Sequence, residues 1–406
     1  MKLMQKFFSV ACVLALTASL TTTVFAANSG YGLIVNGETA TFEAGTEPIN
    51  VEGRLLFPLR TVFNAINDGS GDLDWDEANR MVTISLRDRE VVLRIDNPEA
   101  EVNGVTVPVL DGIAPIIHND RTYLPLRFIA EQFDMVVGWN DEHAIASVVD
   151  RNVYETVRTL LLESESDSNR LSCDLSMVMD TSISINTANV IEQQTSQVNM
   201  VGSFNIDLEN DFTHIVATSS ATGSTPGFDV DFEVEMYISR DEMFLRVDGE
   251  WITVESNDHT DLGFDSSGIM NSLDMADLEA MAEVFDDFDP YLTLGYSVNA
   301  NGNTTVSGVI FLPAEEMSDL ILGIQLDQFD INFVSLYTSP INVEYIFSQE
   351  TGNMISMEME FTMTVRMHVE GQPVDLLYSY TIRLDNINLN PDFVSVIPDS
   401  VRNQAQ

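Results

Sequence analysis

Beyond its first 26 residues the chain contains one cysteine and no lysine. Cys12 lies in the apolar N-terminal stretch, so Cys173 is left alone once that stretch is removed. A single thiol cannot form an internal disulfide, and the fold must therefore depend on hydrophobic cores. Lys2 and Lys6 also lie in the N-terminal stretch. The fixed positive charges that follow are all arginines, which keep their charge at high pH.

Positive charge is scarce throughout the chain. After residue 26, 16 arginines stand against 64 acidic residues, which gives a net charge of −48 with histidine neutral. Such a chain repels phosphate backbones, so nucleic acid is excluded as a partner. Anionic membrane surfaces and anionic wall polymers are repelled as well, unless divalent cations bridge the two surfaces.

Long hydrophobic runs are absent after the N-terminus. Lys2 and Lys6 precede an apolar run from about Phe7 to Val24, and "VFA" before Ala27 fits a small-residue cleavage site. We therefore expect residues 1–26 to be a signal peptide and the protein to be extracellular, either secreted or associated with the cell surface. No later uncharged apolar run reaches the ~18 residues that span a bilayer, so we expect no transmembrane helix in the mature chain.

Recognisable catalytic motifs are also absent. The sequence contains no glycine-rich phosphate loop, no His-Glu-x-x-His motif and no paired-cysteine metal motif. Its five histidines are scattered, at positions 118, 143, 214, 259 and 368. Pairs of acids carry no information about catalysis in a chain with 64 of them. We predict that the protein is not an enzyme and has no catalytic residues, no cofactor and no metal site.

Residues 31–150 contain one pattern twice. "VNG" occurs at residues 35–37 and again at 102–104, "GRLLFPLRTVFNAI" starts at Gly53, and "DRTYLPLRFIAEQF" starts at Asp120. Asn-Gly favours a tight turn between short strands. The proline of each "PLR" motif is suited to the first turn of a helix. Each copy is thus predicted to be a strand–helix–strand element, and the two copies must share a core.

An acidic stretch, Asp68–Glu77, lies within the first copy. Its composition is that of a calcium loop, but Thr83 stands twelfth from Asp72, where such loops carry glutamate. We expect a solvated turn before Trp75, and the sequence leaves weak divalent-cation binding open.

The doubled "PLR…W" pattern resembles the copper amine oxidase N-terminal-like domain, also called the stalk domain. The resemblance covers residues 27–150 and implies a non-catalytic surface or adaptor module. The oxidase itself needs a tyrosine-derived cofactor and three histidine ligands, and we find no matching tyrosine in this sequence. The resemblance therefore implies no amine oxidation.

The hydrophobic period changes after residue 150. Residues 151–169 are predicted to be a helix and a polar linker, and from residue 170 apolar and polar side chains alternate along several segments. Strict alternation is typical of an antiparallel sheet with one apolar and one solvated face. In "MEMEFTMTVRMHV", residues 357–369, four methionines share one face. We predict an α+β protein in which a two-repeat stalk domain precedes a larger curled antiparallel half-barrel with covering helices, at 267–285 and 313–324.

The apolar face supplies the candidate ligand-facing residues. They lie at alternating positions of the predicted strands: Met177, Met179, Val234, Met236, Met357, Met359, Phe361, Met363, Met367, Tyr378 and Tyr380. Methionine pairs can bind Cu(I), but no nearby histidine or cysteine completes a site, since His368 has the opposite parity. Methionine suits an adaptable binding surface and a packed core equally well, so the sequence leaves both interpretations open.

Residues 170–406 resemble the LolA-like and LppX-like lipoprotein-carrier fold. The resemblance is carried by "MYISRDEMFLRVDGEWITV" (236–254), "EYIFSQETGNM" (344–354) and "NPDFVSVIPDS" (390–400). It implies a hollow that holds a lipid or another apolar ligand. The competing hypothesis is a structural or adhesion protein of the cell envelope, with a cell-wall component as partner and no small-molecule ligand.

Overall fold

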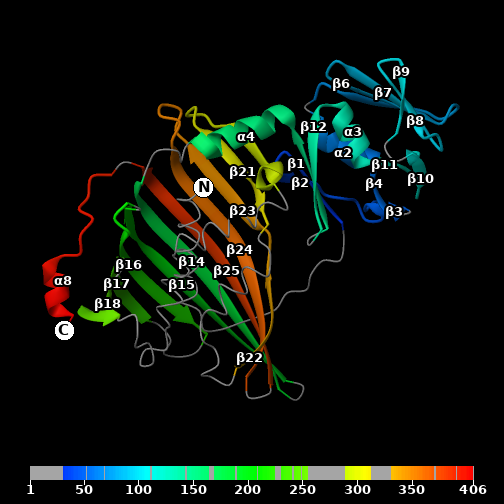
Figure 1. Ribbon diagram of the computed structural model, residues 1–406. Helices are drawn as coiled ribbons and strands as arrows, with labels where there is room; N and C mark the ends of the chain where they lie inside the picture. Colours follow the sequence, from blue (N-terminus) through cyan, green and yellow to red (C-terminus); the bar gives the residue numbers. More distant parts are fainter. Residues whose placement is uncertain are drawn as a thin grey trace. The chain divides into compact units, whose positions relative to one another are not determined.

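The computed structural model divides the chain into two compact units (Figure 1). It describes residues 31–51, 53–67, 69–109, 112–141, 144–163, 169–187, 190–207, 209–224, 230–239, 242–247, 249–254, 289–311, 331–369, 372–389 and 391–405. The N-terminal unit comprises Asn28–Arg158 and Phe288–Tyr296, and the sheet unit comprises Thr159–Asp287 and Ser297–Gln406.

The N-terminal unit contains three small sheets and short helices. Its sheet orders are β12-β13-β1-β2, β10-β11-β4-β3 and β5-β6-β7-β8-β9. The elements are β1 (Gly32–Val35), β2 (Glu38–Thr39), β3 (Ile49–Val51), β4 (Arg54–Pro58), α2 (Leu59–Ile66), β5 (Asp72–Asp76), β6 (Met81–Leu86), β7 (Arg89–Arg94), β8 (Glu99–Val102), β9 (Val105–Pro108), β10 (Ile116–His118), β11 (Arg121–Pro125), α3 (Leu126–Gln132), β12 (Met135–Asn140), β13 (Ile145–Asp150) and η2 (Pro290–Thr293). Helix α4 (Arg151–Glu163) follows β13. It extends beyond Arg158, which is the last residue of the first segment of the N-terminal unit.

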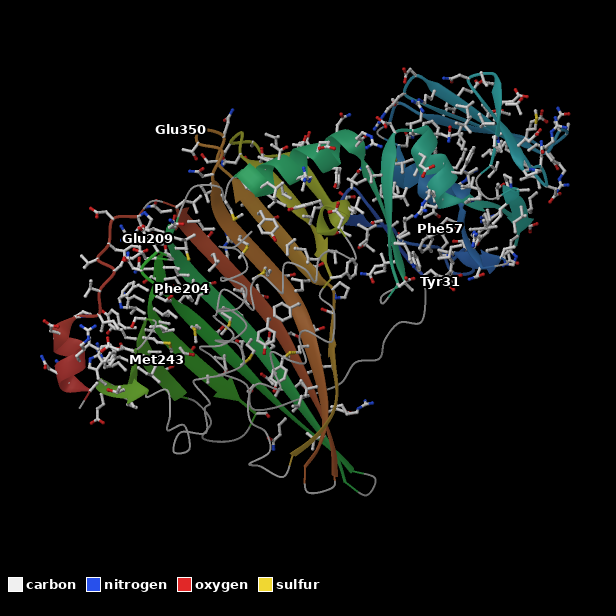
Figure 2. All side chains as sticks on the ribbon, viewed as in Figure 1. Tyr31, Phe57, Phe204, Glu209, Met243 and Glu350 are labelled. Atoms are coloured by element: carbon white, nitrogen blue, oxygen red, sulfur yellow. The ribbon has the colours of Figure 1, made fainter. Side chains whose placement is uncertain are left out.

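The two sequence repeats pair with each other. Strands β4 and β11 are antiparallel, and Phe57 lies directly opposite Leu124, which is the equivalent residue of the second copy. Equivalent residues can face each other in this way only across a local two-fold axis. Both copies contribute to one buried core, in which Phe57 is 2% exposed and Leu124 is fully buried (Figure 2). The predicted shared core is confirmed.

The predicted turns and helix starts of the repeats are also observed. Asn36 and Asn103 both have φ of 49°, and each is followed by a glycine with positive φ, as the tight turn requires. Pro58 and Pro125 immediately precede α2 and α3. The acidic stretch differs from the expectation, because Asp72–Asp76 forms strand β5 and pairs with β6 instead of forming a turn.

A short segment from late in the sequence completes the N-terminal unit. Residues 288–296 belong to this unit, and the Tyr154 hydroxyl donates a 2.6 Å hydrogen bond to the Asp289 carboxylate. Burial and the neighbouring carboxylate raise the pKa of Tyr154 to about 12, so the phenol stays protonated and keeps donating at neutral pH. The alternating pattern of the sequence contained no signal for this placement.

The sheet unit is built on one 12-stranded sheet, whose last strand in the order, β20, begins in residues that belong to the N-terminal unit (Figure 1). The strand order is β19-β18-β17-β16-β15-β14-β25-β24-β23-β21-β20, and β22 also pairs with β24. The strands are β14 (Arg170–Thr187), β15 (Val190–Asp207), β16 (Phe212–Gly223), β17 (Val230–Ile238), β18 (Met243–Val247), β19 (Glu250–Val254), β20 (Leu294–Val298), β21 (Thr304–Ile310), β22 (Ile331–Thr338), β23 (Ile341–Phe347), β24 (Met354–Val369) and β25 (Gln372–Asn388), and a short helix, α8 (Asp399–Gln404), ends the chain.

The long alternating strands confirm the predicted fold class. The fold is α+β, with a curled antiparallel sheet following the small repeat unit. Strand β24 has 16 residues and β25 has 17, and they pair along their length. Strand β14 pairs with β25, so the first and last long strands of the unit lie side by side. The helices predicted at 267–285 and 313–324 lie outside the described residues.

Candidate functional site

The apolar face of the 12-stranded sheet is the candidate site. Register carries one row of side chains across four strands, because Met359 pairs with Ile382, Ile382 with Met177, and Met177 with Met200. The next row runs parallel to it and contains Phe361, Tyr380, Met179 and Val198. Since side chains alternate between the faces of a strand, both rows lie on the same face.

Most of the predicted ligand-facing residues are brought together there. Eight of them lie on the neighbouring strands β24, β25 and β14, and each is at most 6% exposed: Met177, Met179, Met357, Met359, Phe361, Met363, Tyr378 and Tyr380. Val234 and Met236 lie on β17, where register through β16 places them on the same face, but they are only partly buried. The side chain of Met367 is outside the described part of the structure.

Aromatic rings lie among the methionines. Phe361 stacks on Tyr380 with 4.9 Å between ring centroids, and Tyr380 lies 6.0 Å from Tyr378 in a second stacked pair. These rings present flat apolar surfaces, whereas a methionine side chain can adopt many shapes. The combination gives a face that can fit irregular apolar partners.

Some residues on this face were not identified from the sequence. Strand β16 contributes Ile215, Ala217 and Ser219, which register places opposite Phe204, Gly202 and Met200 of β15. The side chains along β16 are small or polar, so its alternation is weak and no strand was predicted there. Phe204, which the alternation of its own strand does indicate, is 2% exposed and belongs to the same face (Figure 2). Ser219 is buried but satisfies its hydroxyl by donating to the Asn199 carbonyl at 3.3 Å.

The opposite face of the sheet is polar and carries cross-strand ion pairs. Arg383 lies opposite Glu358 in register, with 3.2 Å between the charged groups, and Arg366 pairs with the register partner Asp375. Opposite charges placed directly across two strands stabilise a sheet modestly. The contrast between the two faces fixes the register, because a slip by one residue would bury these charges.

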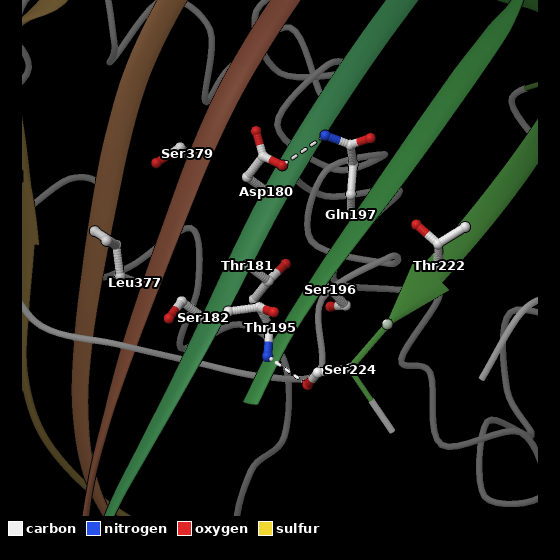
Figure 3. Close-up of a pocket in the computed structure, with 11 residues that line it drawn as sticks. Asp180, Thr181, Ser182, Thr195, Ser196, Gln197, Thr222, Ser224, Leu377 and Ser379 are labelled. Carbon is white, nitrogen blue, oxygen red and sulfur yellow. Dashed lines mark hydrogen bonds between the residues drawn. The ribbon is translucent and has the colours of Figure 1, made fainter. Parts of the chain in front are cut away.

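A hollow of about 360 Å³ lies mainly on the polar face (Figure 3). In its lining, the Gln197 amide donates a 2.7 Å hydrogen bond to the Asp180 carboxylate. The other lining residues mostly carry hydroxyl groups: Thr181, Ser182, Thr195, Ser196, Thr222, Gly223, Ser224, Leu377 and Ser379. Among the described residues of this lining, Asp180 is the one ionisable side chain.

The side chains that could bind a metal ion lie on different faces of the sheet. Cys173 lies on the apolar face, opposite Phe204, whereas His214 of β16 lies on the polar face beside Glu235. Within the described ranges, no three His, Cys, Asp or Glu side chains are grouped to hold a metal ion. The expectation that the protein has no metal site stays a prediction.

Cys173 should be unreactive in the folded protein. Its side chain is 4% exposed, and burial, assisted by the charge of Asp174, raises the pKa of the thiol to about 12. At pH 8 the thiolate population is about a thousand-fold below that of an ordinary cysteine, and the thiolate is the reactive form. We expect a thiol reagent such as DTNB to modify Cys173 only after denaturant is added.

A matched control for this experiment moves the single thiol to the polar face of the sheet. Val201 is 57% exposed, so a Cys173→Ser, Val201→Cys double variant should react rapidly while folded. Modification of native wild-type protein at the rate of this double variant would contradict the buried position of Cys173.

No helix in the described part of the chain is both long and apolar enough to cross a bilayer.

Comparison with curated proteins gives no match. Two family models match the sequence. The copper amine oxidase N-terminal domain matches residues 34–148, which confirms the resemblance found in the repeats. A family of unknown function (DUF6612) matches residues 156–406.

Several solved structures are similar to the chain at low TM-scores. LprF from Mycobacterium bovis has 12% identity, covers 60% of this chain and 95% of its own, and gives a TM-score of 0.25. A LolA superfamily protein from Nitrosomonas europaea has 6% identity, with 61% and 96% of the two chains covered and a TM-score of 0.15. A structure that describes lipid–protein interactions in lipovitellin has 7% identity, with 57% of this chain and 27% of the other covered and a TM-score of 0.25. At these TM-scores the three structures carry no inference about a ligand.

Proposed function

We propose that this chain, which belongs to the family of unknown function DUF6612, is an exported, non-enzymatic binding protein. In this proposal the sheet unit holds an apolar or amphiphilic ligand against the apolar face, and the copper amine oxidase N-terminal domain acts as the stalk that presents it. The signal-like N-terminus supports export, and the divisions at 27–150, 151–169 and 170–406 are retained as proposed domains.

The two adjacent rows of methionine and aromatic side chains carry this proposal. Met359, Ile382, Met177 and Met200 form a continuous apolar row across four strands, and the Phe361 row lies beside it. Strand β24 has 16 residues, so the face extends for roughly 50 Å at about 3.3 Å per residue. A surface of this length suits an extended hydrocarbon chain better than a compact polar metabolite.

A structural role in the cell envelope is the second candidate. Met177 and Met179 are each 1% exposed, which is the burial expected of an ordinary protein core. In that case the apolar face contacts only protein, and the chain acts as a spacer or as a contact for a cell-wall component. Ligand content distinguishes the two functions directly.

Native mass spectrometry of the exported chain, purified without detergent, should show a mass excess that solvent extraction removes and that chromatography identifies as lipid. Removing the ligand should lower the melting temperature, and adding back oleic acid should restore it. Ligand at a hundred times its dissociation constant contributes about 2.7 kcal/mol, or roughly 5–10 °C for a unit of this size.

Two substitutions on one strand sharpen this experiment. Met359→Gln places an amide on the apolar face and should reduce the recovered lipid several-fold, whereas Glu360→Gln changes only the polar face and should leave it unchanged. A bare polypeptide mass, with no thermal response to oleic acid in the wild type, would eliminate the ligand-binding function and favour the structural one.

A further inference from the structure

A second hollow lies on the polar face, at the end of the sheet where the C-terminal segment packs. It has a volume of about 470 Å³ and is lined by Asn205, Phe212, His214, Tyr237, Phe393, Val394, Val396, Ile397, Pro398 and Asp399. We call it the aromatic pocket. All of its residues belong to the sheet unit. Phe212, His214 and Tyr237 have the opposite parity to the residues of the apolar face, so this pocket is separate from the proposed ligand surface.

Four aromatic rings meet at the aromatic pocket. His214 and Tyr237 are nearly parallel, with 4.1 Å between centroids, and Phe212 lies 6.3 Å from both Tyr237 and Phe393. Glu235 holds the first pair in place, since it contacts His214 at 3.1 Å and accepts a 3.2 Å hydrogen bond from the Tyr237 hydroxyl. The pocket is therefore lined by a packed group of aromatic rings, in which Phe212 is 4% exposed and Tyr237 9%.

The wall formed by the C-terminal segment is anchored as well. Ser395 donates a hydrogen bond to Asp207, and Arg170 donates one to the Phe393 carbonyl. Burial would raise the pKa of Asp207, but hydrogen bonds from Ser395 and Asn210, with the charge of Arg170, lower it below its ordinary value. The carboxylate thus stays ionised at neutral pH and keeps the segment attached to the sheet.

Aromatic faces in this region already bind cations of the chain itself. The Arg170 guanidinium carbon lies 4.1 Å from the centroid of Phe393, and that of Arg246 lies 6.0 Å from the ring of Trp251. Trp251 in turn lies 5.7 Å from Tyr237. A cation within about 6 Å of a ring face is attracted by the ring quadrupole.

The remaining lining favours a methylated cation. Val394 and Val396 are 80% and 61% exposed, so they offer apolar surface to methyl groups at the mouth of the pocket. The Asp399 side chain at the same rim is 94% exposed, and its carboxylate lies 3.6 Å from the guanidinium of Arg402. The large excess of acidic residues over arginines attracts cations to the surface of the protein and repels anions.

We propose that the aromatic pocket binds a small organic cation with a quaternary or alkylated ammonium group. The ring faces of Phe212, Tyr237 and Phe393 contact the charged methyl groups, and Asp399 faces them from the rim. This site is independent of the ligand proposed for the apolar face, because it uses the other face of the sheet.

Choline and its neutral carbon analogue 3,3-dimethylbutan-1-ol test the proposal, because they have the same shape and differ in charge. Isothermal titration of the full mature chain should show choline binding at least about five-fold more tightly than the neutral alcohol. Equal affinities, or no binding of choline at millimolar concentrations, would overturn the proposal. Tighter binding of N-acetylglucosamine at the same residues would assign the pocket to a glycan and would also overturn it.

Two variants place the binding event in the pocket. Phe393→Leu removes one ring face and keeps apolar volume, so it should weaken choline binding about five-fold without affecting the neutral alcohol. Val201→Thr alters an exposed valine of β15 that does not line the pocket, and this variant should bind choline like the wild type. If Phe393→Leu does not fold, the comparison of the two probes on the wild-type chain still decides the outcome.

Discussion

Gly202→Val is expected to destabilise the 12-stranded sheet by about 3 kcal/mol or more. A Cβ atom added at Gly202 would lie 2.1 Å from the Val216 carbonyl oxygen and 2.8 Å from the Cα of Ala217. Both are backbone atoms of the neighbouring strand β16, so no side-chain rotation can relieve the clash. Strands β15 and β16 would have to separate, and inserting atoms into a packed interior commonly costs 1–3 kcal/mol even without backbone displacement.

Hydrogen exchange detected by mass spectrometry is the appropriate measurement, because it reports on each unit separately. Peptides from 170–182 and 354–366 should lose protection in Gly202→Val, while peptides from 81–94 should not. The control is Val201→Thr, which changes the adjacent residue on the polar face, where the side chain is 57% exposed. Its stability should lie within about 0.5 kcal/mol of the wild type. Unchanged protection of the sheet in Gly202→Val would contradict the close approach of β15 and β16.

Gly295→Val should have an effect of similar size in the N-terminal unit. A Cβ atom at Gly295 would lie 1.8 Å from the carbonyl oxygen of Asn36 and 2.7 Å from the carbonyl carbon. Asn36 cannot move aside easily, because it forms a turn with φ of 49° and its side chain accepts a 2.8 Å hydrogen bond from the Asp150 backbone. We therefore expect a loss of about 3 kcal/mol or more in the unit that contains β1 and β13.

The exchange pattern should be the reverse of that expected for Gly202→Val. Peptides from 31–40 and 144–150 should lose protection, although the substitution lies outside residues 34–148, and peptides from 354–366 should retain it. Val298→Thr alters an exposed residue of the same strand, at 62% exposure, and serves as the control. Loss of protection confined to 354–388 would mean that residues 288–296 are not part of the N-terminal unit.

The alternating segments show how much of the fold can be predicted from local sequence. In residues 357–369 the period of two identified a strand and the side chains that share a face, and β24 has that face buried from Met357 to Val365. This succeeds because alternation follows from the geometry of a single strand. Strand β16 shows the limit, since Ala217 and Ser219 occupy positions on the apolar face but give no hydrophobic signal.

The candidate site could be predicted only in part from the sequence, because alternation reports on single strands. The sequence identified the methionines of β14 and β24 as residues of two different strands. It did not predict that only β25 lies between these strands. Every long strand carries a similar pattern, so the pattern does not specify which strand lies beside which. The aromatic pocket was missed because the C-terminal residue Phe393 and the strand residue Tyr237 meet only when distant segments pack together.

The sequence by itself therefore determined the properties that depend on neighbouring residues: the signal-like N-terminus, the doubled stalk motif, the turns at Asn36 and Asn103, and the two faces of each strand. Tertiary structure alone decided the strand order, the row that joins Met359 to Met200, the placement of residues 288–296 and the packing of the C-terminal segment on the polar face. These features arise from pairings between residues far apart in the chain, which are selected by the total burial and hydrogen bonding of the folded molecule and by no local pattern.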